Sequence, residues 1–166
     1  MESLQKYRIV YQGLSEGVHE FDFDVDNSFF ESLEYSEIKK GDLKAHVVLQ
    51  KKSTFLELDF QINGYVEVVC DRCLDEYMQP IDFEGKLFVK FSEQGEDLAD
   101  DVICLTPSEH ELDIAHYLYE SINLSIPLKR VHPDNEQGES TCNSEMIKRL
   151  ENFKIDEPAD DTIDPR

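Results

Sequence analysis

Residues 43–70 decide the fold, and they read LKAHVVLQKKSTFLELDFQINGYVEVVC. Two stretches place apolar side chains at every second position: Leu43, Ala45, Val47 and Leu49 in the first, and Leu56, Leu58, Phe60 and Ile62 in the second. A period of two is typical of a β-strand with one buried face. The pair Asn63-Gly64 favours a type I′ hairpin turn, so we predict that a third strand returns over residues 65–70.

The same alternation recurs over residues 81–91, which we predict to form a fourth strand. Strands joined by such short connections pair antiparallel, so residues 43–92 should form an antiparallel β meander. Upstream, residues 7–11 and 21–25 are predicted to pair with each other and to join the sheet. A short strand is expected at residues 102–105.

Three short helices are expected around this meander. A capping box at Ser28-Phe29-Phe30-Glu31 should open the first. The second covers residues 113–123 and the third residues 143–154, because both place apolar side chains on one helical face. The predicted fold class is therefore α+β, with an antiparallel β meander or partly closed sheet and two or three short helices.

The length of 166 residues fits one domain, which we assign to residues 1–155 with the meander at its centre. Residues 93–101 are highly charged and have no apolar period, which predicts a solvated loop. Residues 156–166 are acidic and contain two prolines. They are predicted to form a disordered tail.

The charge balance excludes some classes of partner. Sixteen Lys and Arg against 37 Asp and Glu give a net charge of −21, which opposes indiscriminate binding to nucleic acid or to an anionic membrane. No apolar stretch approaches the roughly 20 residues that span a bilayer. The start MESLQKYRIVYQ has no apolar core of a signal peptide, so we expect a cytoplasmic protein without a membrane partner.

One constellation could carry a metal: Cys70 and Cys73 form a C-x-x-C pair, and His132 and Cys142 follow much later in the chain. Two cysteines three positions apart at a tight turn can hold one Zn²⁺, and a returning loop can complete a tetrahedral Cys₃His set. The 58 intervening residues between Cys73 and His132 make this a split Cys/His zinc knuckle rather than a compact finger.

Two other interpretations of the cysteines stay open. Reduced cysteines can pack as small hydrophobic residues or lie on loops, and this is the favoured reading for Cys104 in its short apolar strand. A redox pair is less favoured, because thioredoxin-like chemistry places C-x-x-C at a helix N-terminus. Here a strand leads into the pair.

Basic residues are few, so their positions are informative. Arg72 lies inside the C-x-x-C turn, Lys129 and Arg130 precede His132, and Lys51 and Lys52 lie at a predicted hairpin tip. We expect these five residues to contact RNA or another partner, with Arg72, Lys129 and Arg130 converging if zinc binds. The alternative is that they are solvated cations that balance nearby acids.

Enzyme signatures are missing from the sequence, which has no G-x-S-x-G, P-loop, G-x-G-x-x-G or H-E-x-x-H. His116 and Glu120 are spaced i, i+4 on the predicted second helix, a spacing that more often gives a surface ion pair than a catalytic dyad. We therefore expect no enzymatic activity and no small-molecule substrate.

Three parts of the chain together form a recognisable pattern. They are Cys70-x-x-Cys73-Leu74 after a meander, Glu111-Leu112-Asp113-Ile114 before a helix, and residues 122–127 (INLSIP) followed by His132 and Cys142. Over most of residues 7–155 the chain resembles the YceD family of bacterial large ribosomal RNA subunit accumulation proteins. The resemblance implies a role in accumulation of 23S ribosomal RNA and points to Cys70, Arg72, Cys73, His132 and Cys142 as the family-type site. Related chains continue into a basic tail after a pair like Pro165-Arg166.

The resemblance implies ribosomal RNA or a pre-ribosomal large subunit as the partner, bound through the Cys/His corner. An acidic, chaperone-like binder of a basic large-subunit ribosomal protein is the alternative, because the acidic segments 20–26 and 93–113 would attract such a protein. A metal-dependent hydrolase ranks last, since four protein ligands leave no open position on the metal.

Overall fold

The computed structural model describes residues 2–92, 102–106 and 108–153. Backbone contacts group the chain into two compact units: the sheet unit, Met1–Val68 with Met78–Leu128, and the Cys/His unit, Val69–Tyr77 with Lys129–Arg166. The predicted loop at 93–101 and the predicted tail at 156–166 lie outside the described residues. Whether residues 1–155 fold as one domain stays a prediction.

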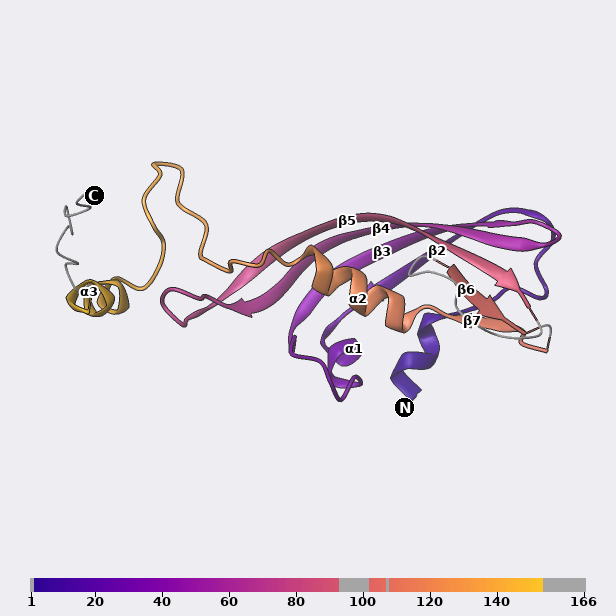
Figure 1. Cartoon of the computed structure of the whole chain (residues 1–166), viewed down its shortest axis with the longest axis horizontal. Helices are drawn as coiled ribbons and strands as arrows, with labels where there is room; N and C mark the ends of the chain where they lie inside the picture. The colour runs from indigo at the N-terminus through magenta and orange to yellow at the C-terminus, as the bar shows by residue number, and fades with distance from the viewer. Residues whose placement is uncertain (1, 93–101, 107, 154–166) are drawn as a thin grey trace, which may run out of the picture. The chain divides into compact units, whose positions relative to one another are not determined.

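The sheet unit is built on five strands in the order β2-β3-β4-β5-β6 (Figure 1). Their bounds are β2 (Gly17–Val25), β3 (Gly41–Lys51), β4 (Phe55–Val69), β5 (Glu76–Phe91) and β6 (Val102–Leu105). Strands β2, β3 and β4 pair antiparallel. The short strand β6 was predicted, and it pairs parallel to β5, with Phe88 opposite Val102. The α+β fold with a mostly antiparallel sheet is confirmed.

The predicted hairpin turn at Asn63-Gly64 is wrong, because both residues lie inside the single strand β4. Gly64 has φ +148° and lies opposite Leu43 of β3. A Cβ atom on Gly64 would come 2.2 Å from the carbonyl oxygen of Asp42. The glycine therefore permits a close approach of two strands rather than a reversal of the chain.

The predicted pairing of residues 7–11 with residues 21–25 is also wrong. Strand β1 (Arg8–Val10), which follows the 3₁₀-helix η1 (Glu2–Tyr7), pairs antiparallel with β7 (Glu111–Asp113) in a separate two-stranded sheet. The register places Ile9 opposite Leu112, and both are buried, while Arg8 forms ion pairs with Glu111 and Asp113. Residues 111–113 thus form a strand, and the following helix α2 begins at Ala115.

The core lies on one face of the five-stranded sheet. Odd-numbered residues of β3 and β5 and even-numbered residues of β4 are its most buried members, and they include Ala45, Val47, Leu49, Leu56, Leu58, Phe60, Ile62, Leu87 and Val89. Helix α2 (Ala115–Ser125) runs along this face (Figure 1). Its Tyr117 ring lies 4.6 Å from the Phe60 ring, and its Leu118 and Ile122 are fully buried.

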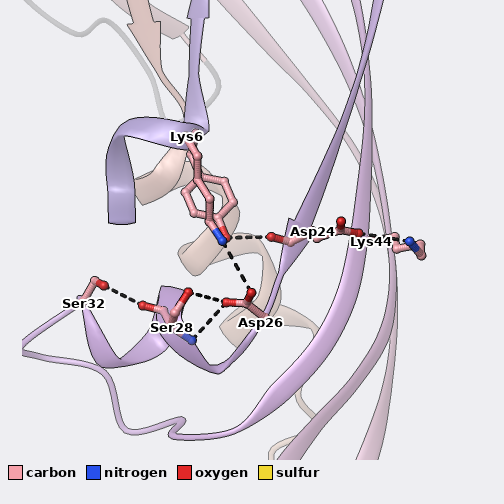
Figure 2. Close-up of polar contacts among 7 residues, drawn as sticks. Lys6, Asp24, Asp26, Ser28, Ser32 and Lys44 are labelled. Carbon is pink, nitrogen blue, oxygen red and sulfur yellow. Dashed lines mark hydrogen bonds and ion pairs between the residues drawn. The ribbon is translucent and has the colours of Figure 1, made fainter. Parts of the chain in front are cut away.

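Helix α1 (Asn27–Glu31) begins one residue after Asp26, whose carboxylate accepts a hydrogen bond from the Ser28 backbone N–H at 3.0 Å (Figure 2). The predicted cap at Ser28 is therefore wrong. Asp26 caps the helix instead, and the Ser28 hydroxyl donates to the same carboxylate. Lys6 of η1 adds an ion pair to Asp26 at 3.5 Å, which joins α1 to the N-terminal segment.

In the Cys/His unit, helix α3 (Ser144–Asn152) matches the helix predicted over residues 143–154. The side chain of Asn143 caps it by accepting from the backbone N–H groups of Glu145 and Met146. None of the helices among the described residues is long and apolar enough to span a bilayer.

We predict that Gly64→Ala destabilises the protein by about 2 kcal/mol or more, because the new Cβ meets backbone atoms of β3 and the residue keeps a positive φ. The measurement is denaturant unfolding. Gly13→Ala is the matched control, since its Cβ meets nothing within 4 Å, and its midpoint should stay near that of the wild type. Equal midpoints for both variants would contradict this role of Gly64.

Candidate metal centre

The C-x-x-C pair lies in the tight connection between β4 and β5. The backbone N–H of Cys70 donates to the carbonyl of Asp75 at 2.9 Å, and the N–H of Leu74 donates to the carbonyl of Cys70 at 2.9 Å. Leu74 closes the turn with φ +63°, a left-handed conformation that is unfavourable for a leucine. The backbone N–H of Arg72 points at the Cys70 sulfur, 3.4 Å away.

The segment that carries His132 is fastened to this turn by Asp71. The Asp71 carboxylate accepts the backbone N–H of Arg130 at 2.7 Å, and the backbone N–H of Asp71 donates to the carbonyl of Arg130 at 2.7 Å. The Arg130 guanidinium adds an ion pair to the same carboxylate at 3.5 Å. Because Arg130 is two residues before His132, these contacts place the imidazole beside the cysteines.

The segment that carries Cys142 is fastened by Asp75. The side-chain amide of Asn143 donates to the Asp75 carboxylate at 3.0 Å, immediately after Cys142 in the chain. Arg72 reaches the same segment, since its guanidinium donates to the Ser140 hydroxyl at 3.2 Å. Residues of the C-x-x-C turn thus hold both returning ligands through hydrogen bonds that do not involve a metal.

The four candidate ligands come together, as the sequence predicted. One ligand atom from each of Cys70, Cys73, His132 and Cys142 lies within 4.8 Å of all the others. The sulfurs of Cys70 and Cys142 are 3.8 Å apart, and Nδ1 of His132 lies 3.4 Å from the Cys73 sulfur and 3.8 Å from the Cys142 sulfur. A tetrahedral Zn²⁺ with Zn–S distances of about 2.3 Å holds its sulfurs about 3.8 Å apart.

The cluster is also the core of its unit. Cys70, Cys73 and Cys142 are buried together, with Tyr77, Val131, Met146 and Ile147 packed against them. Helix α3 contributes no buried residue. Among its described residues, 69–77 and 129–153, the unit therefore has little buried apolar surface besides the three cysteines. A bound metal would supply the missing stabilisation.

The thiols of Cys70 and Cys73 differ in the direction of their pKa shifts. Burial raises the pKa of the Cys70 thiol, but hydrogen bonds from the backbone N–H groups of Cys73 and Arg72 and contact with His132 outweigh it and lower the pKa to about 6. Burial raises the pKa of the Cys73 thiol, and the neighbouring Cys70 and Cys142 sulfurs add to that effect. Of these two thiols, Cys70 therefore loses its proton more readily, and the thiolate is the form that binds a metal ion.

Three thiol groups and one imidazole form a donor set that suits Zn²⁺, and they would occupy all four positions of a tetrahedral ion. The Tyr77 ring lies 4.9 Å from the His132 ring and shields one side of the imidazole. Such a site would hold the two returning segments together. It would leave no coordination position for a substrate or a reactive water.

The predicted partner-binding residues fall in different units. Arg72, Lys129 and Arg130 belong to the Cys/His unit, whereas Lys51 and Lys52 belong to the sheet unit. The Lys51 ammonium donates to the carbonyls of Tyr11 and Leu14, both at 2.8 Å. Lys52 pairs with Glu57 and lies over the Phe55 ring. These contacts give both lysines structural roles within the sheet unit.

Comparison with known protein families adds the identity of the chain. The family described as "Large ribosomal RNA subunit accumulation protein YceD" matches residues 58–166, which is more than half of the chain. The chain belongs to the YceD family. The match includes most of β4, the C-x-x-C turn, both returning ligands and α3, so the whole metal cluster lies within the family region. No curated protein and no solved structure shows significant similarity to the chain.

Sequence reasoning missed the residues that organise the YceD-family site. Nothing in the sequence pattern singles out Asp71 or Asp75, and Asn143 stands out only as the start of a predicted helix. Asp71 accepts a hydrogen bond from Arg130, 59 positions away, and Asp75 accepts one from Asn143, 68 positions away. Only their closeness to Cys70 and Cys73 could have drawn attention to them.

We predict one zinc ion per chain in the purified protein, and loss of the α3 signals when a strong chelator removes it, because the cluster is the only buried core of its unit among the described residues. Elemental analysis and NMR measure the two effects. Cys70→Ser should lose the metal, whereas the control Cys104→Ser should retain it. Metal-free protein with unchanged α3 signals would contradict the prediction.

We predict that Asp71→Ala weakens zinc binding by about 10- to 100-fold, because it frees the segment that carries His132. Asp71→Asn should weaken binding less, since its amide oxygen can still accept the Arg130 N–H. A competition titration with a chromophoric chelator measures the affinities, and Glu136→Ala serves as an exposed control. Equal affinities for Asp71→Ala and Glu136→Ala would show that Asp71 does not organise the site.

Proposed function

We propose that this protein is a non-enzymatic factor in biogenesis of the large ribosomal subunit, and that its zinc-stabilised Cys/His unit contacts large-subunit ribosomal RNA. The family supports the biological role, since its description concerns accumulation of large ribosomal subunit RNA. The direct RNA contact is supported by the distribution of basic side chains that are not neutralised by carboxylates.

In the Cys/His unit, most basic side chains are available to a partner. Within the described ranges, Arg72 and Lys129 are exposed and form no ion pair with a carboxylate. The same holds for Lys148 and Arg149 on α3, two residues that the sequence reasoning did not single out. Arg130 differs, because it pairs with Asp71 and organises the site. This availability of cations is the observation that carries the proposal.

The sheet unit shows the opposite pattern. Six of its basic side chains lie within ion-pair distance of carboxylates, namely Lys6, Arg8, Lys40, Lys44, Lys52 and Lys86. Lys86 alone contacts both Glu57 and Asp59, at 2.9 and 2.7 Å. Phosphate groups would therefore find exposed cations without an ion-pair partner on the described part of the Cys/His unit. The net charge of −21 over the whole chain opposes indiscriminate binding to RNA.

The same site supports a non-enzymatic role. Catalytic zinc sites keep a position open for water or substrate, whereas the Cys₃His set here would fill a tetrahedral ion. The metal would act by holding the Cys70–Cys73 turn against the segments of His132 and Cys142. That closure fixes Arg72 near Ser140 and sets the spacing of the basic side chains.

We predict that the double variant Arg72→Ala/Lys129→Ala binds a large-subunit ribosomal RNA fragment about tenfold or more weakly than the wild type. Its plot of log affinity against log salt concentration should be less steep by about 2, because two phosphate contacts are lost. The zinc-loaded full chain is titrated with the fragment at several salt concentrations.

The control is Lys40→Ala/Lys52→Ala, which removes two lysines that pair with Glu67 and Glu57. This control should bind RNA as the wild type does, or slightly more weakly. Equal affinity and equal salt dependence for Arg72→Ala/Lys129→Ala and the wild type would remove these residues from the RNA contact.

A second candidate function is that of an acidic binder of a basic large-subunit ribosomal protein. The observation that favours it is the exposed row of Glu20, Asp22 and Asp24 on strand β2. These carboxylates lie on the face of the sheet opposite the core, because the alternate residues Phe21 and Phe23 point inward. Through such a surface the protein would support RNA accumulation indirectly, by holding a ribosomal protein before assembly.

A further inference from the structure

We propose that the free edge of β2 binds a basic, extended segment of a protein partner as an additional β-strand. This inference rests on the second candidate function and specifies how the acidic surface would hold its partner. The segment would alternate basic and apolar residues, with the basic side chains toward the acidic row and the apolar side chains toward the core face.

One edge of strand β2 pairs with β3, and no strand of the described ranges pairs with its other edge, which we call the free edge. Strand β2 is the first strand in the sheet order, and all nine of its residues pair with β3, from Gly17 opposite Lys51 to Val25 opposite Leu43. On the other edge, the Tyr7 hydroxyl donates to the carbonyl of Asp24 at 2.7 Å. Tyr7 lies outside this sheet, so the backbone of Asp24 points away from β3.

The direction of the Asp24 backbone groups also gives the direction of the backbone groups of every second residue along β2. In an antiparallel strand, the backbone N–H and C=O of every second residue point to the same edge. The backbone groups of Val18, Glu20 and Asp22 therefore face outward with Asp24. Among the residues that the structure describes, none hydrogen bonds to the outward backbone groups of Glu20 or Asp22. A second strand could pair with them.

The inward side chains of β2 are incompletely covered, as expected for a strand that lacks a neighbour. Phe21 and Phe23 are half-buried, while the residues opposite them on β3, Val47 and Ala45, are 0% and 1% exposed. The two phenylalanine rings stack with a centroid distance of 6.5 Å. Apolar side chains of an added strand would cover them and gain hydrophobic stabilisation.

The outward side chains of β2 define the charge of the partner. Glu20, Asp22 and Asp24 are exposed, and β3 places the Lys44 ammonium against Asp24 and the His46 ring against Asp22. Glu20 lies opposite Val48 and contacts no cation among the described residues. Basic side chains on an added strand would lie opposite these acids, at cross-strand positions where opposite charges attract.

The acidic row also explains why the edge would not bind a second copy of the same strand. Two β2 edges would bring like charges together, and charged edge strands commonly prevent such pairing between copies. The same charges attract a basic strand. Charge complementarity therefore selects a basic partner segment over self-association.

The test uses an eight-residue peptide of alternating Lys and Val, with a peptide of the same composition in blocks of four Lys and four Val as control. The full chain is titrated with each peptide by NMR, and amide hydrogen exchange is measured at saturation. The alternating peptide should bind at least tenfold more tightly than the block peptide and should protect the amides of Glu20 and Asp22. Equal binding of the two peptides, or protection confined to other residues, would overturn the proposal.

Asp22→Pro sharpens the test, because proline removes the outward N–H of Asp22 and leaves the hydrogen bonds to β3 intact. It should lower affinity for the alternating peptide at least tenfold. Asp22→Asn keeps the N–H and should lower it less. Unchanged exchange of the β3 amides verifies the fold of Asp22→Pro. If that variant unfolds, Glu20→Lys/Asp22→Lys takes its place with the same expected loss, and wild-type affinity in the folded variant would overturn the proposal.

Purified basic large-subunit ribosomal proteins, tested one by one, separate the edge from the second candidate function. A protein that binds the wild type and fails to bind Asp22→Pro supports both. A protein that binds the wild type and Asp22→Pro equally supports the function and overturns the edge proposal. Binding of none of them to the wild type overturns the second candidate function and removes the basis of the edge proposal.

Discussion

The closure of the turn at residues 70–73 against the segments of His132 and Cys142 is the constraint on which the Cys/His unit depends. Three thiols and one imidazole form the buried centre of a unit that has almost no other core among its described residues. Asp71 and Asp75 bring the ligands together by hydrogen bonds. A metal ion would convert this loosely stabilised arrangement into a rigid one and fix the basic side chains around it.

Most of the sheet could be predicted from the sequence, because alternation with a period of two directly reflects burial of one face of β3, β4 and β5. The local signal failed at Gly64, where a pair typical of a turn serves a close approach between two strands. It failed again at β1, whose partner β7 is about 100 positions away and meets it through the buried pair Ile9–Leu112 and the ion pairs of Arg8. Pairing between distant short strands leaves no local pattern in a sequence.

The candidate site was partly visible for a related reason. C-x-x-C is a local motif, and His132 and Cys142 could be joined to it by ligand chemistry alone. The carboxylates of Asp71 and Asp75, which position these ligands, could not be predicted from the sequence, because their hydrogen bonds form only in the folded protein. Nor does the sequence distinguish neutralised lysines such as Lys86 from available ones such as Lys129. That difference reconciles a highly acidic protein with a proposed contact to RNA. Carboxylates neutralise most basic side chains of the sheet unit but few of those in the described part of the Cys/His unit.

X-ray absorption spectroscopy at the zinc edge of the native protein tests the central claim most directly, because it reports the ligands of the metal. The account predicts three sulfur neighbours at about 2.3 Å and one nitrogen neighbour at about 2.0 Å. The nitrogen signal should disappear in His132→Ala. A shell of oxygen and nitrogen without sulfur, or a spectrum that His132→Ala leaves unchanged, would contradict the proposed Cys₃His centre.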